Sequence, residues 1–249
     1  MQQQLPTRRT IISFPIMMIR AKSRVFRKEE KKMKRYLLAA VVFSMSAGPA
    51  FAHHPLGGMP METLSDGLLS GLGHPLLGFD HLFFVIAVGI AALYTGRTKL
   101  ATAAYIGAMM LGCLLMSVGL GLPVKEFVIG ISLLVVGGIL LSGRATSLAL
   151  AIGLFAVFGL FHGSAFGDTL AAQEAGAGVP VLVGYLVGLG LLQYGLALLA
   201  GFVVHTLLKA TEAEHIHARL AGAVVAGVGT FLMLEHIEGL VFNMLGLAA

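Results

Sequence analysis

Six apolar segments separated by short polar joints make up most of the chain after residue 68. They run at roughly 75–95, 100–120, 124–142, 147–168, 180–208 and 219–246. Each is close to or longer than the ~18 residues typical of a membrane span. Backbone groups in lipid must be hydrogen-bonded within the protein, so such segments form helices. The pattern predicts an all-α fold, a polytopic integral membrane helical bundle of six transmembrane helices within residues 69–249.

The composition agrees with this assignment. Apolar residues make up 57% of the chain and charged residues only 12%, whereas soluble domains carry about 25% charge. This excludes an ordinary soluble enzyme, a nucleic-acid binder and a disordered protein, and makes the lipid bilayer the first partner. The single cysteine, Cys113, excludes an internal disulfide and a cysteine-based metal site.

The first 52 residues have the features of a targeting segment. A basic start at Met33 is followed by an apolar stretch over 37–45 and by a small-x-small cleavage sequence over 50–52. We therefore predict a signal peptide over 33–52, preceded by a dispensable basic extension over 1–32. The alternative is an uncleaved anchor helix.

Cleavage after Ala52 would leave a periplasmic lead-in over 53–68 that begins with His53 and His54. A free α-amine beside imidazoles can chelate a transition metal, because both are nitrogen donors of intermediate softness. The alternative is a pair of exposed histidines with no ligand.

The charges of the joints predict the orientation. The first, third and fifth joints carry five basic residues, and the second and fourth carry only Lys125. Basic loops stay in the cytoplasm. This predicts a multi-pass protein of the bacterial inner membrane with both mature termini periplasmic. The five basic residues are Arg97, Lys99, Arg144, Lys209 and Arg219.

Small residues four apart predict close helix packing. They occur at Gly159, Gly163 and Gly167 in the fourth segment and at Gly184 and Gly188 in the fifth. This spacing lets helix backbones approach closely in a bilayer.

Ionisable side chains recur within three of the spans, where each costs about 2.5–3.5 kcal/mol on insertion scales. These side chains lie at similar depths in the membrane, because each falls in the outer half of its segment. Those of the first span lie within about 10 Å of its outer end. His74 and His81 are seven residues apart and should share one helix face, with Asp80 beside it. We predict one shared cation site; the alternative is a set of separate interhelical hydrogen bonds. The candidates are His74, Asp80, His81, His162, Asp168, Glu235 and His236.

The ligand types limit which metal ions the predicted site would bind. Imidazole and carboxylate without thiolate suit Ni(II), Co(II), Zn(II) or Cu(II), and argue against a thiolate site for Cu(I). The ion would be substrate, and we expect no permanently bound cofactor. Facing the cytoplasm, His205, His215 and His217 form either a delivery site or a solvated charged loop.

Equal spacing suggests internal symmetry. His74 and Asp80 are six positions apart, as are His162 and Asp168. These pairs open the two three-helix halves, which predicts a possible three-plus-three inverted repeat, a common transporter design.

Four stretches resemble the HupE/UreJ family. They are His-Pro-x-x-Gly-x-Asp-His at 74–81, Phe-His-Gly-x-Ala-x-Gly-Asp at 161–168, the histidine-led 53–58 and Gly-Tyr-Leu-Val-Gly-x-x-x-Leu-Gln-Tyr-Gly at 184–195. The resemblance implies a nickel or cobalt permease, associated with hydrogenase and urease gene clusters and with metallochaperones of nickel or cobalt enzymes as possible partners. By position it carries His74, Asp80, His81 and His162 into the site.

Two positions depart from the family pattern. Many members have a second histidine where this chain has Phe166, and a glutamate where it has Asp168. The loss of an imidazole leaves the metal preference open, and Glu174 is a substitute ligand.

The leading prediction is therefore a transition-metal permease and not an enzyme. One alternative is an intramembrane zinc-dependent hydrolase, in which Ser164, histidine and aspartate would hold Zn(II) and an activated water. The other is a periplasm-facing metal chaperone or sensor that binds without transporting.

Overall fold

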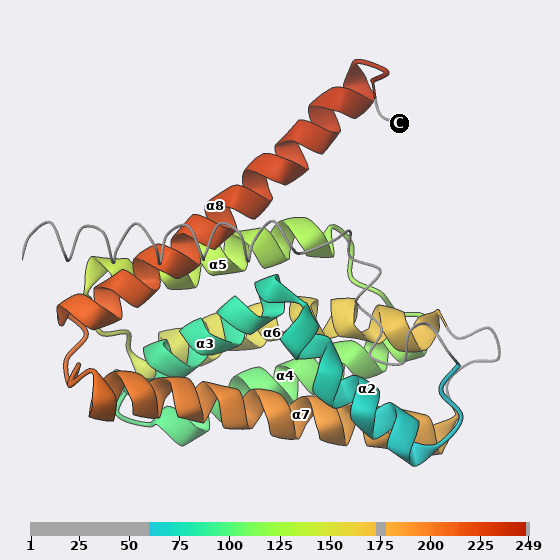
Figure 1. Cartoon of the computed structure of the whole chain (residues 1–249), viewed down its shortest axis with the longest axis horizontal. Helices are drawn as coiled ribbons and strands as arrows, with labels where there is room; N and C mark the ends of the chain where they lie inside the picture. The colour runs from blue at the N-terminus through green and yellow to red at the C-terminus, as the bar shows by residue number, and fades with distance from the viewer. Residues whose placement is uncertain (1–59, 173–177, 248–249) are drawn as a thin grey trace, which may run out of the picture. The chain divides into compact units, whose positions relative to one another are not determined.

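A computed structural model describes residues 60–172 and 178–247, and every regular element in these ranges is a helix (Figure 1). The predicted extension over 1–32 and signal peptide over 33–52 lie outside the described residues, as do His53, His54 and Glu174.

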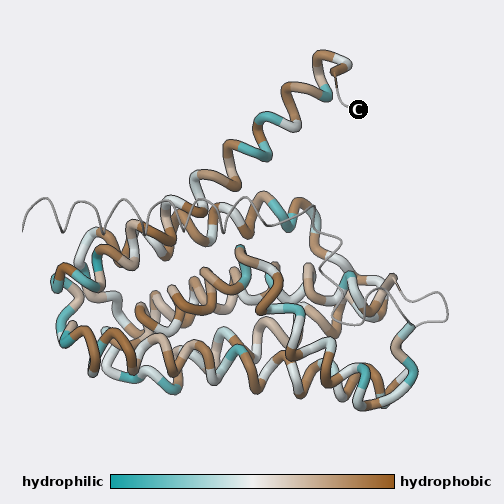
Figure 2. The backbone as a smooth tube through the Cα atoms, in the orientation of Figure 1, coloured by the Kyte–Doolittle hydropathy of each residue, from teal (hydrophilic) through white to brown (hydrophobic). Residues whose placement is uncertain are grey.

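Five helical segments are long and apolar enough to cross a membrane singly, and one bent pair of shorter helices passes the same test together. Figure 2 shows apolar residues along all of them. The chain is therefore a multi-pass membrane protein, as predicted. The elements are α2 (Leu64–Leu77), α3 (Phe79–Leu93), α4 (Thr98–Ser117), α5 (Lys125–Ser142), α6 (Leu148–Ala171), α7 (Val179–Phe202), the π-helix η1 (Val203–Leu207) and α8 (Ile216–Met244).

The first predicted span differs from the prediction, because it is not one helix. Helices α2 and α3 meet at 83°, and Gly78 between them has extended backbone, with φ −89° and ψ 101°. Pro75 in the last turn of α2 cannot donate a backbone hydrogen bond, which weakens the helix at this point. His74 thus lies in the last turn of one helix and His81 in the first turn of the next, so the expected shared helix face is wrong. The helix also starts earlier, at Leu64, inside the predicted lead-in.

The two halves nevertheless form one crossing. Gly67 of α2 packs against Val181, and Gly89 of α3 packs against Ala197, so both halves advance along α7 in the same direction. The two contact points on α7 are 16 residues apart, which is about 24 Å along a helix. The α2–α3 pair is therefore a broken span, and the bundle has six crossings within the described residues.

Alternation of the crossings defines two ends of the bundle. Helices α2, α5 and α7 begin at one end, which we call the α2 end, and α4, α6 and α8 finish there. The opposite end, where η1 lies, is called the η1 end.

Three helix pairs pack backbone to backbone, namely α4 with α6, α2 with α7, and α5 with α8. A Cβ atom at Gly163 would overlap the carbonyl oxygen of Met109, and one at Gly184 would overlap that of Leu64. The close packing predicted from the glycine spacing is confirmed at both places.

Helix α8 packs on α5 only along its first part. Gly222 and Gly229 contact α5, whereas beyond Leu234 nearly every side chain is exposed, and Figure 1 shows this half of α8 diverging from α5. The 29 residues of α8 span about 43 Å at 1.5 Å per residue, more than the ~30 Å hydrocarbon thickness. The polar residues near its end therefore belong to the α2 end of the bundle.

Candidate metal-transit site

Three buried imidazoles form a row at the break between α2 and α3. His74 lies in the last turn of α2, His81 lies in the first turn of α3, and His162 comes from α6; their exposed fractions are 7%, 6% and 0%. The ring centroids of His74 and His81 are 6.2 Å apart, and those of His81 and His162 are 5.0 Å apart. The break thus brings together two histidines that a straight helix would have stacked two turns apart. We call these three residues the histidine row.

Hydrogen bonds determine which nitrogen of each ring carries a proton. Ser132 on α5 donates its hydroxyl proton to the carbonyl of Ile129 at 2.6 Å, so it must accept from His162 Nε2 at 2.9 Å. A neutral imidazole protonated at Nε2 has its lone pair at Nδ1. That lone pair accepts the proton of His81 Nδ1 across 2.8 Å. Ser132 therefore determines the tautomer of His81, although it contacts His81 only through His162.

This tautomer leaves the lone pair of neutral His81 on Nε2, beside Asp80. His81 Nε2 lies 3.7 Å from Asp80 Oδ2. An imidazole nitrogen with a free lone pair and a neighbouring carboxylate are metal ligands of the kinds that suit nickel, cobalt, zinc or copper ions. The same pair can hold a proton instead, because a protonated His81 would form an ion pair with Asp80.

His74 is held in a comparable way by its own partners. Tyr185 on α7 donates its hydroxyl proton to the carbonyl of Phe166 at 3.0 Å, and its oxygen lies 2.9 Å from His74 Nδ1. Thr169 Oγ1 is 3.0 Å from the same nitrogen. Donation from Nδ1 places the lone pair of neutral His74 on Nε2.

Phe166 packs against two members of the histidine row. Its ring centroid is 5.1 Å from that of His74 and 4.1 Å from that of His81. An apolar ring therefore lies beside both histidines, at the position where the resemblance implies an imidazole in many family members.

The seven predicted ligands do not form one cluster. Asp168 lies apart from the histidine row and pairs with Lys125 at 2.5 Å. Over residues 60–172 and 178–247, no three His, Cys, Asp or Glu side chains are grouped so that they could hold a metal ion together. The two pairs of equal spacing also differ, since the break separates His74 from Asp80 while α6 runs unbroken from His162 to Asp168. The inverted repeat remains a prediction.

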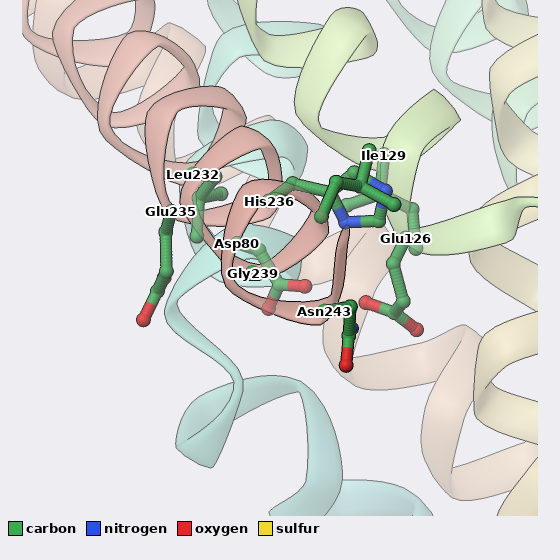
Figure 3. A pocket seen from close by; sticks show the side chains of 9 residues that line it. Asp80, Glu126, Ile129, Leu232, Glu235, His236, Gly239 and Asn243 are labelled. Carbon is green, nitrogen blue, oxygen red and sulfur yellow. The ribbon is translucent and has the colours of Figure 1, made fainter. Parts of the chain in front are cut away.

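A polar pocket at the α2 end collects the other acidic candidates. It has a volume of about 390 Å³ between α3, α5 and α8. In Figure 3, Glu126 and Asn243 converge below His236, whereas Glu235 projects to one side. We call this cavity the acidic pocket; its polar lining residues are Asp80, Glu126, Glu235, His236 and Asn243.

Asp80 links the acidic pocket to the histidine row, because its carboxylate lines the pocket and its Oδ2 lies beside His81. Glu126 is a lining residue that the sequence did not single out, since it stands next to Lys125 at a joint between spans. The sequence feature that could have identified Glu126 is its position as a carboxylate in the first turn of a membrane span. Val124, which precedes this turn, has a left-handed φ of 49°, an uncommon conformation for a β-branched residue.

The family follows from a match that extends over most of the chain. Residues 40–232 match the family described as HupE / UreJ protein. The chain belongs to the HupE/UreJ family. It is 27% identical over 205 residues to Protein HupE of Rhizobium leguminosarum bv. viciae, an alignment that covers 80% of this chain and 99% of that protein. No solved structure matches the chain significantly.

At the η1 end, this HupE/UreJ member has a second polar cavity of about 420 Å³, lined by Tyr94, Glu212 and Glu214 among others. Burial raises the pKa of the Tyr94 hydroxyl, which stays protonated and donates to the carbonyl of Ala210.

The three candidate histidines of the η1 end are more exposed than the histidine row. The rings of His215 and His217 are 5.0 Å apart, and His217 Nδ1 lies 3.1 Å from the carbonyl oxygen of Leu208. His205 is exposed in the π-helix η1.

Ser164, which the alternative hydrolase would use with histidine and aspartate to hold Zn(II) and an activated water, has a structural partner in this family member. Its Oγ accepts the backbone N–H of Leu122 at 2.9 Å and so ties α6 to the joint before α5. None of the hydrogen bonds described for Ser164 connects it to the histidine row.

Proposed function

We propose that this HupE/UreJ protein is a permease that carries nickel or cobalt inward across the bacterial inner membrane. The observation that carries the proposal is the contact of His81 with His162 at the break of a membrane-spanning helix. Ionisable residues buried inside a membrane bundle are costly to insert, and they commonly mark pathways of ions or protons. Discontinuous helices are a recurring way to expose ligands near the middle of a transporter.

The acidic pocket is the proposed entrance. If the basic joints face the cytoplasm, the α2 end faces the periplasm. Its lining contains carboxylates and no lysine or arginine, which favours entry of cations by electrostatic attraction. An ion bound by Asp80 would then reach His81 without leaving protein ligands, because the two side chains are neighbours.

The two helix ends at the break have opposite partial charges. The C-terminal end of α2, whose last turn carries His74, bears about half a negative charge, and the N-terminal end of α3, whose first turn carries Asp80 and His81, bears about half a positive charge. The attraction for a cation at the proposed transit site therefore comes from the Asp80 carboxylate and the imidazole nitrogens.

The membrane potential can drive this transport. A doubly charged ion gains about 4.6 kcal/mol in moving inward across 100 mV. Asp80 or its neighbour His81 is the proposed carrier of a coupling proton. After release at the η1 end, the ion would pass to metallochaperones of nickel or cobalt enzymes.

Uptake of radiolabelled nickel and cobalt tests the proposal. Cells expressing residues 33–249 should take up one of these ions saturably, and His74→Ala and His81→Ala at equal expression should reduce this uptake by at least about tenfold through loss of a ligand. Tight metal binding with no uptake above cells carrying an empty vector would instead favour the chaperone or sensor. Metal-dependent cleavage of a lipid or peptide without uptake would favour the hydrolase.

The acidic pocket gives a separate prediction. Glu126→Gln removes one negative charge while keeping the side-chain shape, so we expect KM for uptake to rise about threefold to tenfold at low ionic strength and Vmax to stay near wild type. The difference should shrink as salt is added, because salt screens exposed charges. Glu238→Gln on α8, whose carboxylate is not among the pocket-lining residues, is the matched control. Equal KM values for the two variants would remove Glu126 from the entrance.

A further inference from the structure

A second polar group lies deeper in the bundle, beyond the histidine row. Tyr105 on α4 donates its hydroxyl proton to Gln193 Oε1 on α7 at 2.5 Å. Both side chains are fully buried. Gln193 lies eight residues after Tyr185, which is about 12 Å further towards the η1 end. We call Tyr105, Gln193 and Thr102 the inner node.

The inner node is adjacent to the histidine row. The ring centroid of Tyr105 is 6.5 Å from that of His162, and the backbone carbonyl of Tyr105 packs on Gly159, one turn before His162 on α6. An ion or water leaving the histidine row past His162 towards the η1 end therefore meets Tyr105 next.

Two polar atoms of the inner node have no hydrogen-bond partner. They are Gln193 Nε2 and Thr102 Oγ1, both on residues with 0% exposure. Turning the Gln193 amide by 180° exchanges its oxygen and nitrogen, so one of the two is unpaired in either orientation. A buried polar group without a partner costs about 1–3 kcal/mol, and proteins normally satisfy such groups with water or a ligand.

The Thr102 hydroxyl lacks the usual partner of a hydroxyl inside a helix. Thr230 and Ser132 donate to carbonyls of their own helices. Thr102 makes no such bond, and neither does Ser70 on α2. Because Thr102 lies on α4 one turn before Tyr105, we assign its hydroxyl to the same node.

We infer that the inner node is a second binding station, which takes the divalent cation in partly hydrated form after it leaves the histidine row. This inference rests on the proposed function. The node offers amide and hydroxyl oxygens, and such oxygens hold nickel or cobalt more weakly than imidazole does. A site of lower affinity placed after the histidine row would let the ion move on towards the η1 end instead of remaining bound.

The Gln193 amide suits both states of such a station. While Gln193 Oε1 accepts from Tyr105, Nε2 is available to donate to a water molecule of the partly hydrated cation. After the 180° turn, Nε2 would donate to the Tyr105 oxygen and Oε1 would face the cation. The Tyr105 hydroxyl proton would then have to rotate towards a water molecule.

Gln193→Leu and Thr102→Val test the inference, with Thr230→Val as the matched control because its hydroxyl is already bonded to Ala226. In cells expressing the full chain, we expect both test variants to lower Vmax for nickel uptake about tenfold, the size of effect that follows from losing one buried polar partner. KM should stay near wild type, and so should equilibrium nickel binding to the purified protein, because the histidine row is unchanged.

The outcomes separate the two proposals. No uptake by the wild type would overturn the permease itself. Wild-type uptake with Gln193→Leu and Thr102→Val indistinguishable from Thr230→Val would overturn the inner station alone and leave the node as a place for structural water. Parallel loss of nickel binding in the two variants would also overturn it, because the node would then belong to the first site. Thr102→Val is nearly isosteric, so it remains informative if Gln193→Leu fails to fold.

Discussion

Nickel uptake is expected to fall about 10- to 100-fold in His162→Gln and to remain within a few-fold of wild type in His162→Asn, the scale typical of losing or keeping a partner that orients a metal ligand. The asparagine amide oxygen reaches the position of Nδ1 and can still accept the proton of His81. Glutamine instead reaches the position of Nε2 and keeps only the bond to Ser132. Without an acceptor, His81 can move its proton to Nε2 and lose the lone pair that faces Asp80.

The two amides form a matched pair, since each retains one of the two hydrogen bonds of His162 and neither carries charge. Radiolabelled uptake at equal expression, with nickel binding to the purified variants, measures the effect. Equal loss in both variants would mean that His162 itself ligates the ion, and equal retention would remove the His81 tautomer from the mechanism.

Gly163→Ala is expected to destabilise the bundle by roughly 3 kcal/mol, the upper part of the range for overpacked cores. An added Cβ would overlap the Met109 carbonyl, a backbone atom that cannot rotate away, so α4 and α6 must separate. Gly153→Ala, on the same helix with nothing within 4 Å, should be neutral or stabilising by up to about 1 kcal/mol, because alanine favours helix over glycine.

Cys113 supplies the measurement. It is the one cysteine of the chain, it is fully buried, and it packs on Gly163. A thiol-reactive fluorophore added during a thermal ramp in detergent therefore reports opening of the α4–α6 interface. We expect labelling of Gly163→Ala at a clearly lower temperature than wild type. Coincident curves for Gly163→Ala and Gly153→Ala would contradict the packing argument.

Much of the fold could be predicted from the sequence because its signals are local. The length of each apolar segment specifies a span, and glycines four apart specify where two backbones meet; both expectations hold at α4, α6 and α7. The break of the first span also left a signal, in Pro75 and Gly78. Hydropathy did not reveal it, because a broken span and a continuous one have the same apolar content.

The candidate site could be predicted only in part. Residue type and depth led to the histidine row, but they also grouped Asp168 with it, although Asp168 faces Lys125. Depth along the membrane is one coordinate, and it does not say which side of a helix a side chain occupies. The roles of Ser132 and Tyr185 gave no comparable signal, because their histidine partners lie 30 or more residues away in the chain. Glu126 gave none because the pocket that it lines is formed by three helices.

The sequence by itself determined that this chain crosses the membrane repeatedly and keeps imidazoles and carboxylates where lipid would exclude them, because hydrophobic burial and helix formation depend on each segment alone. The tertiary structure decided the 83° break, the order of the histidine row and the joining of Asp80 to both the acidic pocket and His81. These depend on distances between helices, which are set by how closely the glycine faces pack and not by any one segment.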